Sequence, residues 1–147
     1  QVVEEMVREG RLFSDITYIK REKTFGNSRF DLYLEHGGRK HYIEVKGVTL
    51  EVNGVARFPD APTERGVKHI YELIEAKRQG YQASIIFIIQ MKGVRAFGPN
   101  RKDHPDFAEA LKAAKTAGVE ILAFDCRVSE DCLVCDQKIP VWLDELH

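Results

Sequence analysis

The sequence predicts an α/β fold of three layers, in which a central mixed β-sheet is flanked by helices. Residues 83–90 are apolar on both faces, as expected of a central strand that helices cover on each side. Helical periodicity marks residues 63–79 and 105–117, and a glycine follows each stretch as a stop signal. Residues 29–46 alternate between apolar and polar side chains around a central Gly-Gly pair, which predicts a β-hairpin.

Shorter signals place the remaining elements. The first ten residues favour a helix that ends at Gly10, with an apolar stripe of Val3, Met6 and Val7. Strands are expected at residues 16–21 and 119–124, the second leading into a tail of short strands. Loops are expected between residues 46 and 63 and at 92–104. The helix over 63–79 should bury one stripe, made of Val67, Ile70, Tyr71 and Ile74.

Length and composition indicate one globular domain spanning residues 1–147, in which 44% of the residues are hydrophobic and the formal net charge is −1. This charge excludes a uniformly basic nucleic-acid binder, so attraction to phosphate requires a local patch. No apolar run approaches the ~20 residues of a membrane helix, so no membrane partner is expected. Three cysteines cannot all pair within the chain, which favours a reducing, cytoplasmic setting. Because the chain starts inside the first helix, we expect a longer parent protein.

The register of the hairpin places charged residues opposite one another. If the turn is centred on the Gly-Gly pair, opposed residues have numbers that sum to 75. One side then carries these opposed pairs: Arg29 with Lys46, Asp31 with Glu44, Tyr33 with Tyr42, and Glu35 with Lys40. The other side is expected to be core, made of Phe30, Leu32, Leu34, Ile43 and Val45. The β-carbons of Asp31 and Glu44 should lie roughly 4.5–5.5 Å apart.

Two facing carboxylates repel each other, and a divalent cation between them would remove the conflict. With no His or Cys in the set, Asp31 and Glu44 suit Mg²⁺ or Mn²⁺. Lys46 points to the same side and would orient a water molecule or stabilise an oxyanion. A cation, two carboxylates and a lysine are what phosphodiester hydrolysis requires. The alternative is that these are ordinary polar residues on a solvent-facing side of the sheet.

Basic residues are expected close to this hairpin. Arg65, Lys68 and His69 share one face of the helix over 63–79, opposite its apolar stripe. With Arg57 just upstream and Arg29 on the hairpin, they predict a basic lip that holds a DNA backbone without reading sequence. The alternative for the helix is a merely solvated face.

The cysteines carry a weaker signal. Cys132 and Cys135 have the spacing of half a zinc site, which Cys126 and His147 could complete. With no second Cys-x-x-Cys pair, buried thiols or a local disulfide are favoured.

Several stretches resemble the sugar fermentation stimulation protein family, SfsA. They are GNSRFD at 26–31, YIEVKGVTL at 42–50 and FPDAPTERG at 58–66, with GVE at 118–120 and IPV at 139–141. The resemblance implies the PD-(D/E)xK, or restriction-endonuclease-like, fold. It also implies an upstream OB-like domain, which this chain does not match.

The family resemblance implies DNA as the partner, with a link to the regulation of sugar-utilisation genes. By position, Asp31, Glu44 and Lys46 correspond to the PD-(D/E)xK motif, and Phe30 stands where many such nucleases have proline. Many of these nucleases add a metal-binding carboxylate from the first helix, for which Glu5 is the candidate and Glu4 the alternative. Two functions stay open: a Mg²⁺- or Mn²⁺-dependent deoxyribonuclease, and a non-catalytic DNA-binding regulator that retains a nuclease fold.

Overall fold

The computed structural model describes residues 2–128 and 133–144, and within these ranges one large sheet organises the chain. In spatial order its strands are β1 (Ile16–Phe25), β2 (Ser28–His36), β3 (Arg39–Val48), β6 (Gln82–Ile89), β8 (Glu120–Val128) and β9 (Leu133–Lys138). Strands β1, β2 and β3 are antiparallel, β3, β6 and β8 are parallel, and β9 returns antiparallel to β8. The predicted mixed sheet is therefore confirmed.

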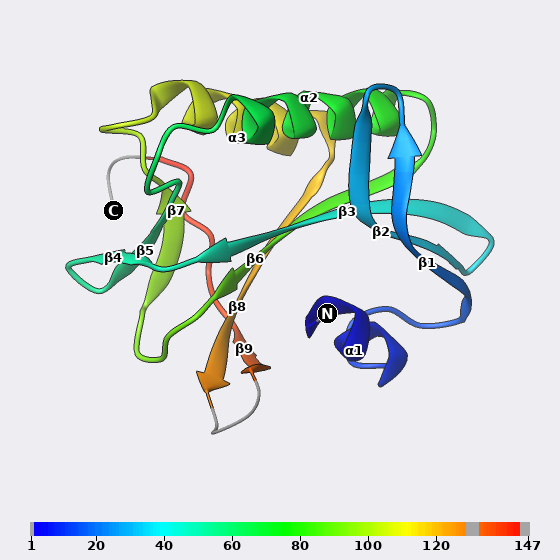
Figure 1. Ribbon diagram of the computed structural model, residues 1–147, viewed down its shortest axis with the longest axis horizontal. Helices are drawn as coiled ribbons and strands as arrows, with labels where there is room; N and C mark the ends of the chain where they lie inside the picture. Colours follow the sequence, from blue (N-terminus) through cyan, green and yellow to red (C-terminus); the bar gives the residue numbers. More distant parts are fainter. Residues whose placement is uncertain (1, 129–132, 145–147) are drawn as a thin grey trace.

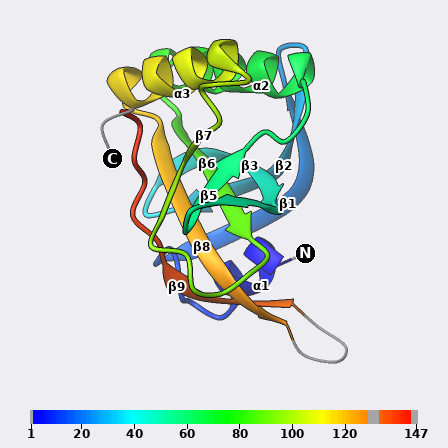
Figure 2. The same cartoon turned by 90° about the vertical axis from the view of Figure 1, so that its left-hand side faces the viewer.

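Helices cover both faces of this sheet (Figures 1 and 2). Helices α2 (Glu64–Arg78) and α3 (Pro105–Ala117) pack together over one face, and α1 (Val2–Arg8) lies on the other. Strand β6 serves both layers, since Ile85 and Phe87 join the core under α2 and α3 while Ile86 joins the core under α1. No helix in the described ranges is both long and apolar enough to cross a membrane.

A second, smaller sheet occupies segments that we expected to be loops. It consists of β4 (Leu50–Val52), β5 (Val55–Phe58) and β7 (Ala96–Pro99). Asn53 and Gly54 both have positive φ and turn β4 back onto β5, and β7 then pairs in parallel with β5. These strands have only three or four residues each, which is too short for alternation to distinguish them from a loop.

The hairpin register is confirmed from Leu32–Ile43 to His36–Arg39, where every β2–β3 pair sums to 75, including Tyr33–Tyr42 and Glu35–Lys40. The predicted pairs Asp31–Glu44 and Arg29–Lys46 are not formed, because the β2–β3 pairing ends at Leu32 and Ile43. Leu32 and Ile43 do share the core under α1. Phe30 was assigned to that face wrongly: it belongs to the core under α2, where its ring lies 5.8 Å from that of Tyr42. Strict alternation fails here because Phe30 lies beyond the last β2–β3 pair.

Helix α2 buries a different face from the one that we expected. Tyr71 was expected to be buried but is 49% exposed, whereas Leu73 is fully buried. The buried set is Gly66, His69, Ile70, Leu73 and Ala76, with Val67 and Ile74 partly buried. This rotation carries His69 from the expected polar face into the interior, directly above β3.

Candidate active site

Asp31 lies where β2 separates from β3. The last paired residues are Leu32 and Ile43, and beyond them Asp31 Oδ2 accepts a hydrogen bond of 2.7 Å from the backbone N–H of Val45. The side chain thus takes the place of a ladder carbonyl and is fixed against β3. The pKa of Asp31 is raised from 3.8 to about 6, first by burial and then by the adjacent Glu44 carboxyl group, against lowering contributions from Val45 N–H and Lys46.

Glu44 is a buried carboxylate, only 3% exposed. Its Oε2 atom receives the Lys46 ammonium at 3.0 Å and contacts Nδ1 of His69. Its Oε1 atom is buried and has no hydrogen-bond partner. Asp31 comes within hydrogen-bonding reach of this carboxyl group, so the structure brings the predicted residues Asp31, Glu44 and Lys46 together.

The donor set fits a hard divalent cation. A buried oxygen without a donor is costly, and two neighbouring carboxyl groups destabilise each other unless a positive charge joins them. Oε1 of Glu44 is such an oxygen, and Glu44 raises the pKa of Asp31, so the ammonium of Lys46 offsets only part of the repulsion. A third ligand is not supplied: within residues 2–128 and 133–144, no group of three His, Cys, Asp or Glu is arranged to hold a metal.

The carboxylates of α1 are not brought to this pair. Glu4 is buried and bound by Arg8 at 2.9 Å and Arg21 at 3.1 Å. Glu5 is exposed, and the apolar side chains of α1 pack on the sheet face opposite α2. The structure therefore gives no support to Glu5, or to Glu4, as an additional metal ligand.

His69 was expected on the exposed, DNA-binding face of the helix, but it is buried. It is 5% exposed, contacts the Glu44 carboxylate and packs with its ring 5.9 Å from that of Phe30. The pKa of His69 is lowered to about 4, first by burial and then by the charges of Lys46 and Arg65. The ring is therefore neutral at pH 7 and donates from Nδ1 to Glu44.

The exposed basic residues Arg29, Arg65 and Lys68 are brought together, as predicted. They line a hollow of 470 Å³ beside His69, together with Asn27 and Glu64. Lys68 Nζ donates to the carbonyl of Asn27 at 2.9 Å, which ties α2 to the tip of the β1–β2 hairpin. Three cations and one carboxylate give this hollow a net positive character.

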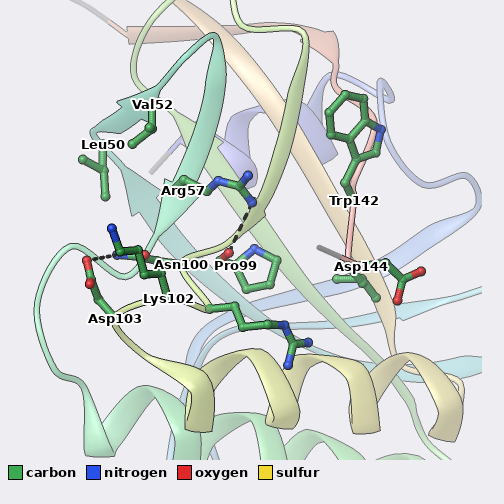
Figure 3. Close-up of a pocket in the computed structure, with 11 residues that line it drawn as sticks. Leu50, Val52, Arg57, Pro99, Asn100, Lys102, Asp103, Trp142 and Asp144 are labelled. Carbon is green, nitrogen blue, oxygen red and sulfur yellow. Dashed lines mark hydrogen bonds between the residues drawn. The ribbon is translucent and has the colours of Figure 1, made fainter. Parts of the chain in front are cut away.

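Arg57 is separated from these residues. It lines a different hollow of 440 Å³ between the small sheet and the C-terminal segment, where Trp142 and Asn100 also lie (Figure 3). Its Nη1 atom donates to the carbonyl of Pro99 at 3.3 Å. The charges around this second hollow nearly balance, since it is lined by three cations and two carboxylates: Arg57, Arg101, Lys102, Asp103 and Asp144. The expected basic lip therefore does not include Arg57.

The cysteines that the structure describes are buried thiols. Cys126 on β8 and Cys135 on β9 are opposed in register, and both are free. Burial raises the pKa of both thiols, that of Cys135 to about 12. Cys132 and His147, the other members of the zinc alternative, lie outside the described residues.

Fold and site together define a class of protein: a mixed α/β domain with paired carboxyl groups and a lysine beneath a helix. The chain belongs to the sugar fermentation stimulation protein family. A family model described as "Sugar fermentation stimulation protein RE domain" matches residues 1–132. Comparison with the sequence shows that this match includes Asp31, Glu44 and Lys46.

Relatives named "Sugar fermentation stimulation protein homolog" are similar over most of the chain. The protein from Clostridium beijerinckii is 54% identical over 133 residues, covering 90% of this chain and 59% of the relative. That from Desulfitobacterium hafniense strain DCB-2 is 52% identical over 145 residues, covering 99% of this chain and 63% of the relative. The chain thus spans less than two thirds of the length of these relatives.

A solved structure shares the fold. The structure of Pyrococcus furiosus SfsA in complex with Ca²⁺ matches with a TM-score of 0.84 and 33% sequence identity. The match covers 96% of this chain and 61% of that one.

Proposed function

We propose that this chain is a PD-(D/E)xK-type nuclease domain that hydrolyses DNA phosphodiester bonds with Mg²⁺ or Mn²⁺. The observation that carries the proposal is the unpartnered buried oxygen of Glu44, next to the Asp31 carboxyl group and beside the ammonium of Lys46. The unpartnered oxygen and the neighbouring carboxyl groups each cost stability in the absence of a bound cation, and the ammonium of Lys46 compensates only in part.

The roles of the residues follow from their chemistry. Asp31 and Glu44 would hold the cation through carboxylate oxygens, which hard divalent ions prefer. When bound, such an ion supplies a lowered water pKa and neutralises charge on the phosphate. Lys46 cannot act as a ligand while protonated, so its ammonium is left to orient the attacking water or to stabilise the charge that develops on phosphate oxygens.

The surroundings support DNA as the substrate. Arg29, Arg65 and Lys68 surround the hollow beside His69, whose ring touches Glu44. Exposed cations in this position can hold a phosphate backbone next to the carboxylates without reading bases. The Ca²⁺ complex of the Pyrococcus furiosus protein supports a preference for hard cations, since Ca²⁺ and Mg²⁺ both take oxygen ligands.

A DNA-binding regulator without catalysis is the second candidate. The family description, which refers to stimulation of sugar fermentation, favours it. A regulator would use the same basic hollow but would have no need of paired carboxyl groups.

The experiment is a titration of Mg²⁺ and of Mn²⁺ with the full-length protein against single-stranded, duplex and branched DNA. Cleavage of at least one DNA form, dependent on the cation, supports the nuclease. DNA that is bound but never cut, with either ion, would leave the regulator as the explanation.

A further inference from the structure

The two carboxylate oxygens of Glu44 differ in their hydrogen-bond partners. Lys46 Nζ, at 3.0 Å, and His69 Nδ1 both reach Oε2, whereas Oε1 is buried with no partner. Two donors on Oε2 fix the rotation of the carboxylate group, and Oε1 is left without a hydrogen-bond donor.

His69 is held firmly enough to impose this orientation. Its ring is 5% exposed and packs against that of Phe30 at 5.9 Å. It also lies in the interior of α2, whose N-terminus is capped by the Thr63 hydroxyl accepting from Gly66 N–H. The ammonium of Lys46, on a longer and more flexible side chain, is less restrained.

We infer that His69 is a positioning residue: it holds Oε2 of Glu44 so that Oε1 is the oxygen available to a divalent cation. This inference rests on the metal centre proposed above and adds a residue from α2 to it. In this role His69 is not a ligand of the ion and acts through Glu44, whose Oε2 atom it contacts. Outer partners of this kind change metal affinity or activity by roughly 10–100-fold when removed.

Three substitutions of His69 distinguish the effect of its hydrogen-bond donor from the effect of its side-chain size. His69→Leu removes the donor. His69→Asn places an amide N–H near the position of Nδ1, whereas His69→Gln carries its amide one bond further, beyond Glu44. His41→Leu is the matched control, because His41 is also a buried imidazole, 3% exposed, with a polar partner in Ser84 at 2.7 Å.

The measurement is Mn²⁺ affinity by calorimetry on the full-length protein, with thermal unfolding of each variant recorded beside it. His69→Leu should lose about 10–100-fold in affinity, and His69→Asn should recover most of that loss. His41→Leu should lower stability and leave Mn²⁺ affinity unchanged. If His69→Leu does not fold, the contrast between the Asn and Gln variants decides, with tighter binding expected for Asn.

The outcomes distinguish this inference from the proposed function. Equal Mn²⁺ affinity in wild-type protein and all His69 variants overturns the positioning role alone. Wild-type protein that binds no Mn²⁺ overturns the metal centre and the inference with it. The expected affinity changes in a protein that cuts no DNA would support the positioning role and reject only the catalysis.

Discussion

The paired carboxyl groups should cost the cation-free protein measurable stability. The pKa of Asp31 is raised from 3.8 to about 6, mainly by burial and then by the contact with Glu44. Because the folded-state pKa lies above the unfolded one, the native state binds more protons between these values. Stability therefore falls as pH rises from about 4 to 6, and the loss is complete above that window.

The size of the effect follows from this shift. The difference between 3.8 and about 6 corresponds to about 3 kcal/mol at 1.36 kcal/mol per pKa unit. Asp31 is partly exposed, and solvent screening reduces this to about 1–2 kcal/mol at pH 7. Asp31→Asn removes the charge while its amide oxygen can still accept from Val45 N–H. The variant should be more stable than wild type by about that amount and should lose Mn²⁺ binding.

The assay is urea unfolding of both proteins in the presence of a chelator, at pH 7 and at pH 4. The stability advantage of Asp31→Asn should appear at pH 7 and shrink at pH 4. Asp60→Asn, at an exposed position, is the control and should change stability at neither pH. An Asp31→Asn variant that is less stable than wild type at pH 7 would contradict a destabilising charge at Asp31, as would a stability advantage that does not depend on pH.

Three further predictions concern other residues. Lys46→Ala should keep its Mn²⁺ affinity in calorimetry but lower the cleavage rate by about 10²–10³, the usual loss for one electrostatic transition-state contact; a proportionate loss of affinity would make the lysine structural. Arg65→Ala should weaken DNA binding equally for all sequences and reduce the salt slope by about one, and an unchanged slope would mean a solvated face. In a Cys132→Ser background, the thiols of Cys126 and Cys135 should react slowly with a thiol reagent until urea unfolds the protein, because both are buried; rapid labelling of native protein would contradict this burial.

The hairpin could be predicted from sequence because its register depends on local rules. A Gly-Gly turn and alternation of side chains fixed the pairing of Tyr33 with Tyr42, which the structure has. Alternation failed at Phe30, where β2 has already separated from β3. Strand separation depends on how Asp31 bonds to β3, which no pattern of single residues reveals.

Helix α2 shows the limit of periodicity. Several neighbouring stripes fit its sequence, and tertiary packing selects among them. The structure selects one that exposes Tyr71 and buries His69. A buried histidine over a carboxylate could not be distinguished from a surface histidine beside Lys68 until α2 was placed on β3. The small sheet was missed for a similar reason, since the pairing of β5 with β7 joins residues about 40 positions apart.

The most direct test of cation-dependent DNA cleavage at Glu44 is a single-turnover assay in Mn²⁺ with wild-type protein and Glu44→Gln, purified side by side. The substitution keeps the shape of the side chain and removes the charge that would hold the cation. Wild-type protein should cut DNA, whereas the variant should bind the same DNA with similar affinity and no longer cut it. Equal cleavage by both proteins would contradict a role for Glu44, and no cleavage by either would contradict the nuclease.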